Sequence, residues 1–218
     1  MSDNILAELP WAPLTAQPGD VRGLPESEGD NLIISATQVD GQWVILSRYG
    51  DDIWQLGGFP GNVEANKKRL DFSTVPQAFR RVMKAILYRY LRRGRCGAGR
   101  PKGAGARHFF SGARPFLRYL ETLKLDHLGA VTPLLCSTYV SACKAHRQTS
   151  RSKGKPLSQS GLLGRFKAVE ALYELSQYTD DRMPQHPWPE TSSKALAGLT
   201  GSGAPHKQGG KTPLIPDD

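Results

Sequence analysis

The sequence is poor in cysteine and has no long apolar run. Its three cysteines form an odd, sparse set, which favours reduced thiols over a disulfide framework. No window approaches the roughly 18 apolar residues of a membrane helix. The N-terminus also lacks the basic and apolar regions of a signal peptide. We therefore expect a cytoplasmic protein, in a bacterial cytosol or nucleoid, with no membrane partner.

Acidic residues are scarce beyond Asn66. Residues 1–66 contain 2 Lys and Arg against 10 Asp and Glu, whereas residues 67–218 contain 27 against 10. The two parts carry net charges of −8 and +17, which together give the overall +9. This asymmetry predicts a polyanion partner for the basic part and a separate role for the acidic part, although solubility alone is an alternative explanation.

Composition and hydrophobic periodicity divide the chain into four segments. We expect a mobile, disordered N-terminal tail, a small acidic β meander, a helical domain for the polyanion partner and a linker rich in Gly, Ser, Pro and Lys. Their predicted bounds are 1–29, 30–66, 67–189 and 190–218.

The acidic segment is predicted to form a three-stranded antiparallel meander over residues 31–57. Asp40-Gly41 separates NLIISATQV from QWVILSRY, and both central residues of a type I′ turn need positive φ. The run IWQL supplies the third strand. Trp43 and Trp54 are assigned to the core, because a small sheet needs its aromatic side chains for stability.

Several helix boundaries are predicted from capping residues. Thr74 and Gln77 form a capping-box pattern, Thr132 is followed by proline at the first helical position, and Ser158 is a suitable N-cap. Pro115 lies within the helical pattern of residues 108–125. It either kinks that helix or marks a late start near Ser111.

The most basic stretch is RYLRRGRCGAGRPKGAGAR (89–107), which has five glycines and no acidic residue. Such a loop cannot pack into a core, yet it can follow a phosphate backbone. It lacks the Gly-Lys-Ser/Thr pattern and preceding strand of a nucleotide-binding P-loop, so no cofactor is expected. The basic loop 147–156 leads directly into the last long helix, near an N-terminus that suits phosphate.

The last long helix, within residues 157–189, has a small outer face with a single cation. At 100° per residue, Ser160, Gly164, Lys167 and Ala171 share the side opposite the apolar stripe. Small residues let a helix approach a nucleic-acid groove closely.

Together these segments resemble the N-terminal core-binding domain of the tyrosine recombinases, the phage-integrase family. The resemblance is carried by RPFLRYLETL (114–123), VTPLLCSTYV (131–140) and LLGRFKAVEALYELS (162–176), followed by HPWP. It implies a mainly α fold, a SAM-like bundle of about four helices forming half of a C-shaped clamp on duplex DNA. It also implies self-association on DNA and a role in DNA integration and recombination.

The recombinase active site has no counterpart in this sequence. KTPLIPDD (211–218) is similar to the beginning of the family's catalytic domain. The His-x-x-Arg pattern followed by a distant tyrosine, which that domain carries, is absent. The status of the chain as an enzyme is therefore open, and no catalytic residue is assigned. Cys136, Cys143 and His146 lack the close cysteine pair and fourth ligand of a zinc site, so no metal is expected.

Eleven residues are predicted to contact DNA. The phosphate contacts are Arg95, Arg100, Lys102, Arg107, Arg151, Lys153 and Lys155, and the groove contacts are Arg114, Ser160, Arg165 and Lys167. Two alternatives stay open: a non-catalytic DNA- or RNA-binding regulatory protein, and an interaction protein whose acidic meander binds a protein partner.

Overall fold

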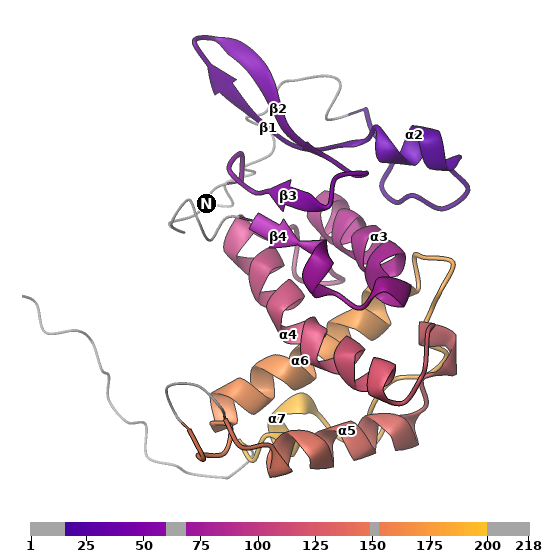
Figure 1. Cartoon of the computed structure of the whole chain (residues 1–218), viewed down its shortest axis with the longest axis vertical. Helices are drawn as coiled ribbons and strands as arrows, with labels where there is room; N and C mark the ends of the chain where they lie inside the picture. The colour runs from indigo at the N-terminus through magenta and orange to yellow at the C-terminus, as the bar shows by residue number, and fades with distance from the viewer. Residues whose placement is uncertain (1–15, 60–68, 149–152, 200–218) are drawn as a thin grey trace, which may run out of the picture.

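The computed structural model describes residues 16–59, 69–148 and 153–199. In these ranges it has six helices and two small antiparallel sheets, with the strands preceding the long helices. Figure 1 shows the sheets at one end of the molecule and α5 and α7 toward the other. No helix in the described ranges is long and apolar enough to cross a membrane. The elements are α2 (Glu26–Asp30), β1 (Ile33–Val39), β2 (Gln42–Arg48), β3 (Ile53–Gln55), β4 (Arg69–Asp71), α3 (Gln77–Arg93), α4 (Gly103–Thr122), α5 (Pro133–Ala145), α6 (Gln159–Ser176) and α7 (Ser193–Leu196).

The predicted hairpin is confirmed. Strands β1 and β2 pair antiparallel around Asp40 and Gly41, whose φ angles are 50° and 77°. Positive φ at both positions is what a type I′ turn requires.

The predicted three-stranded meander is wrong. Strand β3 pairs with β4, so the region holds two separate two-stranded sheets. Side chains explain why β3 does not extend the hairpin: Ser47 Oγ accepts a hydrogen bond from Gln55 N (2.7 Å), and Ser35 Oγ donates to Gln55 O. Trp54 is fully buried, as predicted, whereas Trp43 is only half-buried.

The second half of the predicted mobile tail contacts the rest of the molecule. The Gln17 side chain bonds the backbone of Ile33, and the Tyr88 hydroxyl donates to Pro18 O at 2.8 Å. This segment then forms the short helix α2 (Figure 1). Residues 1–15 lie outside the described ranges.

The predicted capping box at the start of α3 is wrong. The helix begins at Gln77 after Pro76, which makes no side-chain cap. Thr74 lies instead in a 3₁₀ turn, Phe72–Thr74, where its hydroxyl accepts a hydrogen bond from Arg114.

Helix α4 contains Pro115 in its interior. The helix runs without interruption through this proline and begins at Gly103, so the late start near Ser111 is wrong. Much of the basic run 89–107 is therefore helical, divided between the end of α3, a short turn and the first turn of α4. Packing outweighs the poor helix propensity of the glycines, because Gly103, Ala106 and Phe109 are buried.

The predicted starts of α5 and α6 are confirmed. Thr132 accepts a hydrogen bond from Leu135 N, and Ser158 accepts one from Gly161 N, both at 3.2 Å. Each cap satisfies a backbone donor that has no partner within its own helix.

Helices α4 and α6 cross closely where glycine faces alanine. A Cβ built on Gly112 would lie 2.9 Å from Ala168 Cβ and 3.1 Å from Gly164 O. Both helices belong to one continuous hydrophobic cluster, which also includes Trp54 from the strands.

The first residues of the predicted linker form part of the folded structure. Glu170 on α6 accepts hydrogen bonds from Trp188 Nε1 (2.6 Å) and Ser193 N (3.1 Å), which attaches α7 to α6. Residues 200–218, including KTPLIPDD, lie outside the described ranges.

The crossing predicts opposite effects for two glycine-to-alanine substitutions. Gly112→Ala should lower the free energy of unfolding by about 1 kcal/mol, because overpacking outweighs the gain in helix propensity. Gly164→Ala should raise it by about 0.5–1 kcal/mol, since no atom beyond the adjacent residues and backbone of α6 lies within 4 Å of the place its new methyl group would take. Urea unfolding of both variants measures the difference, and equal effects would contradict the close crossing.

Glu170 predicts a pH-dependent contribution to stability. Burial raises the pKa of Glu170, but the bonds from Ser193 and Trp188 outweigh it and hold this pKa below the ordinary value. Its contribution is therefore present above the ordinary pKa of about 4.3 and is lost as the pH falls through the lower, folded-state value. Glu170→Gln should cost about 1 kcal/mol at pH 7, after allowance for solvent screening.

Urea unfolding of the native chain and Glu170→Gln from pH 7 down to pH 3 measures this contribution. The difference between them should shrink in acid. A difference that stays constant across this range would show that the charge of Glu170 contributes nothing.

Candidate nucleic-acid interface

A groove of about 470 Å³ lies between α4 and α6, and we call it the α4–α6 groove. Residues from the end of α3 and from the turn that follows it complete its wall. Its lining consists of Tyr90, Arg95, Gly105, His108, Phe109, Ser111, Gly112, Ser160, Gly161, Gly164, Arg165, Lys167, Ala168 and Ala171.

The α4–α6 groove brings together four of the predicted DNA contacts. Arg95 comes from the turn after α3, whereas Ser160, Arg165 and Lys167 come from α6. None of the residues described as lining the groove is acidic. Its charge is therefore positive, and its glycine-rich wall leaves room for a ligand backbone.

The predicted outer face of α6 is only partly exposed. Ser160, Gly164 and Lys167 are exposed, as the helical wheel predicts. Ala171 is buried, at 3% exposure, so its assignment to that face is wrong. Helix α6 also packs against α3, and Tyr90 of α3 lines the same groove as Ala171.

Arg95 is held at the groove by a carboxylate. Glu174 on α6 accepts bonds from Arg95 Nε and Nη2, both at 2.7 Å, and from Cys96 N at 2.8 Å. This combination of a guanidinium fork and a backbone N–H is an anion-binding arrangement. In the free protein the Glu174 carboxylate occupies it, so a phosphate must compete with that carboxylate for Arg95.

The glycines after α3 fold the turn that carries Arg95. Gly94 has a φ of 71°, and a Cβ there would lie 1.8 Å from Gly99 O, so only glycine fits. Arg95 N donates to that same carbonyl at 3.2 Å. The stretch predicted as an unpacked loop is therefore a tight turn with defined backbone hydrogen bonds.

Four further predicted phosphate contacts are exposed, and a fifth lies outside the described ranges. Arg100 and Lys102 are exposed on the segment that leads into α4, and Lys153 and Lys155 are exposed just before α6. Lys155 O accepts a bond from Gln148 N, which closes that loop at its base. The fifth is Arg151.

Arg107 and Arg114 lie on another part of α4. They are about 140–160° from Gly112 around the helix axis, at 100° per residue. Both are half-buried, and Arg114 Nη1 donates to Thr74 Oγ1 at 2.9 Å. The structure does not bring these two arginines into the α4–α6 groove.

A buried polar group lies behind Arg165. Its Nη1 approaches Cys143 Sγ at 3.7 Å, next to the buried hydroxyl of Tyr139. Burial raises the pKa of the Tyr139 hydroxyl, and burial raises the pKa of the Cys136 thiol to about 12. The Tyr139 hydroxyl and the Cys136 thiol are therefore protonated and poorly nucleophilic at neutral pH. The described residues contain no cluster of three or more metal-ligating side chains.

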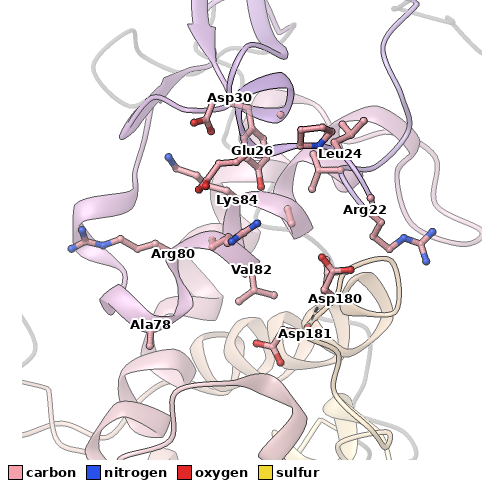
Figure 2. A pocket seen from close by; sticks show the side chains of 18 of the residues that line it. Arg22, Leu24, Glu26, Asp30, Ala78, Arg80, Val82, Lys84, Asp180 and Asp181 are labelled. Carbon is pink, nitrogen blue, oxygen red and sulfur yellow. Dashed lines mark hydrogen bonds between the residues drawn. The ribbon is translucent and has the colours of Figure 1, made fainter.

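A second cavity, of about 450 Å³, lies between the N-terminal segment and α3. Figure 2 shows Glu26 and Asp30 across it from Asp180 and Asp181, with Val82 between the two pairs. Its described lining holds five carboxylates and four cations, so it offers no net attraction to a polyanion. The α4–α6 groove is the better candidate for phosphate.

Sequence reasoning missed the α4 side of the groove. His108, Ser111 and Gly112 line it, but residues 108–125 were predicted only as a helix that Pro115 kinks or that starts late, and no groove residue was assigned to it. The available signal was the spacing of Gly105 and Gly112. Residues seven apart share a helix face.

No known protein family matches the chain, and neither does any curated protein or solved structure. The function is therefore argued from the charge and shape of the groove.

Removal of the Glu174 carboxylate should make the turn after α3 open more often. Glu174→Gln removes the charge-assisted bonds, so the amides of Cys96 and Ala98 should exchange with solvent about tenfold faster, equal to about 1.4 kcal/mol. Hydrogen exchange measures this, with Glu190→Gln as the control because Glu190 is exposed and acidic. Unchanged exchange in Glu174→Gln would show that the carboxylate does not hold the turn.

Proposed function

We propose that this protein binds duplex DNA through the α4–α6 groove. The observation that carries the proposal is the gathering of Arg95, Arg165 and Lys167 around one groove whose described lining includes no acidic residue. Affinity for DNA comes largely from such cations, which displace counterions from the phosphate backbone.

The shape of the groove supports a backbone ligand. Gly161 and Gly164 present no side chain, and a Cβ built on Gly164 meets no atom within 4 Å. The exposed Ser160 hydroxyl lies in the first turn of α6, where backbone N–H groups favour an anion. Phosphate oxygens thus have cations, a hydroxyl and a helix N-terminus within the same groove.

We further propose that the helical domain of residues 67–189 is the DNA-binding part of a site-specific tyrosine recombinase or integrase. The helices α3, α4, α5 and α6 would be its SAM-like core-binding bundle, acting as half of a clamp on DNA and self-associating there. The succession of long helices with basic connections supports this view. The acidic N-terminal segment would then contact a protein partner, because its charge disfavours DNA.

DNA binding should depend on salt concentration and on two groove cations, Arg165 and Lys167. The full chain should bind a mixed-sequence duplex with a log–log salt slope of about −4 to −7, as expected for about 5–8 neutralised phosphates. Arg165→Gln with Lys167→Gln should weaken binding about tenfold or more and reduce the slope by about 1–2. Fluorescence anisotropy at several salt concentrations measures both quantities, with single-stranded DNA and an RNA duplex as competitors.

The matched control is Arg182→Gln with Lys194→Gln, which removes the same charge from exposed positions outside the groove. Gly164→Leu provides a variant with unchanged charge that fills the groove and should also weaken binding. Equal losses of DNA affinity in the control pair and the groove pair would show that binding depends only on overall charge, and would overturn the proposal. Preference for RNA would favour an RNA-binding regulatory protein.

A further inference from the structure

Three arginines converge on the turn before α3, and we call them the arginine cluster: Arg80 on α3 and Arg114 and Arg118 on α4. They contact Ser73–Val75 from two sides. Arg80 Nε and Nη2 donate to two carbonyls of this turn, at 3.0 and 3.2 Å. Arg114 Nη1 donates to the Thr74 hydroxyl (2.9 Å), and Arg118 Nη2 donates to the Thr74 carbonyl (3.2 Å).

The positive charge of the arginine cluster has little internal compensation on its α4 side, whereas Arg80 also lines the second cavity, whose described lining holds five carboxylates. All its acceptors in the turn are neutral, and no ion pair joins these three residues to a carboxylate in the described ranges. Burial lowers the pKa of Arg114, and the nearby charges of Arg118 and Arg107 lower it further. The opposing carboxylate is Asp71, which already accepts two hydrogen bonds from Ser73.

A purely structural role accounts for only part of this arrangement. Attaching the turn to α4 requires hydrogen-bond donors, which neutral amide side chains could supply without mutual repulsion. Each guanidinium has five N–H donors, and the contacts with the turn use one or two of them. Arg114 Nε is buried and does not face solvent, so the donors open to a ligand are those of the exposed Arg118 and the half-buried Arg80. Donors and charge therefore remain for a ligand.

We propose that the arginine cluster is a second phosphate-binding site, distinct from the α4–α6 groove. A guanidinium fork matches the oxygens of phosphate with two parallel hydrogen bonds. The N-terminus of α3, which has no side-chain cap, adds partial positive charge beside Arg80. The recognised chemistry is a phosphate group, and only its source in duplex DNA rests on the proposed function.

The test removes two of the three arginines and measures binding of inorganic pyrophosphate by calorimetry. Arg80→Gln with Arg118→Gln leaves the half-buried Arg114 in place. The native chain should bind pyrophosphate, and this variant should bind about tenfold more weakly or not at all. The matched control is again Arg182→Gln with Lys194→Gln, which should bind like the native chain. If the double variant is poorly folded by circular dichroism, the exposed Arg118→Gln alone replaces it, with a smaller expected loss.

The outcomes separate the site from the source of its phosphate. Equal pyrophosphate affinity in the native chain and the cluster variant, or equal losses in variant and control, overturns the proposal. Loss of pyrophosphate binding together with a duplex salt slope smaller by about 1–2 assigns the site to the DNA backbone. Loss of pyrophosphate binding with an unchanged slope assigns it to a free phosphate compound. If the native chain binds no duplex, the proposed function fails, and the pyrophosphate measurement still tests whether the arginine cluster binds phosphate.

Discussion

The contact on which the candidate interface depends is the crossing of α4 and α6 at Gly112, Gly164 and Ala168. Because no side chain separates the helices there, Gly112 packs directly against the α6 backbone. This crossing fixes the distance between the groove walls, which are lined by His108 on α4 and by Arg165 and Lys167 on α6. A wider crossing would separate these groups and weaken any ligand that bridges them.

The fold could be predicted wherever the deciding information was local. Thr132 and Ser158 cap helices through hydrogen bonds that reach only three residues along the chain. Thr74 has an equally suitable sequence, but Arg114, forty residues away, donates to its hydroxyl. The pairing of β3 with β4 was likewise decided by distant partners. A capping pattern shows that a side chain can cap a helix, whereas tertiary contacts determine whether it does so.

The candidate site was predicted best on α6, where the apolar stripe was continuous and the wheel located Ser160 and Lys167. Composition identified Arg95 as basic but could not show that Glu174, 79 residues away, pairs with it. The α4 wall escaped prediction because glycines disfavour a helix when propensity is considered alone. Buried packing around Gly103 outweighs that preference, and this packing cannot be predicted from helix propensity alone.

Helix α4 relates the groove to the arginine cluster. Around the axis of α4, the partly or fully exposed residues run from Gly112 through Pro115 and Ser111 to Arg107 and Arg118, which lie about 120–140° from Gly112. The two cationic regions therefore lie along opposite edges of one exposed strip of α4. The DNA major groove is about 12 Å wide, with a phosphate backbone along each edge. If both regions bind phosphate, their placement on opposite edges of α4 favours simultaneous contact with the two edges of the DNA groove over contact along one strand.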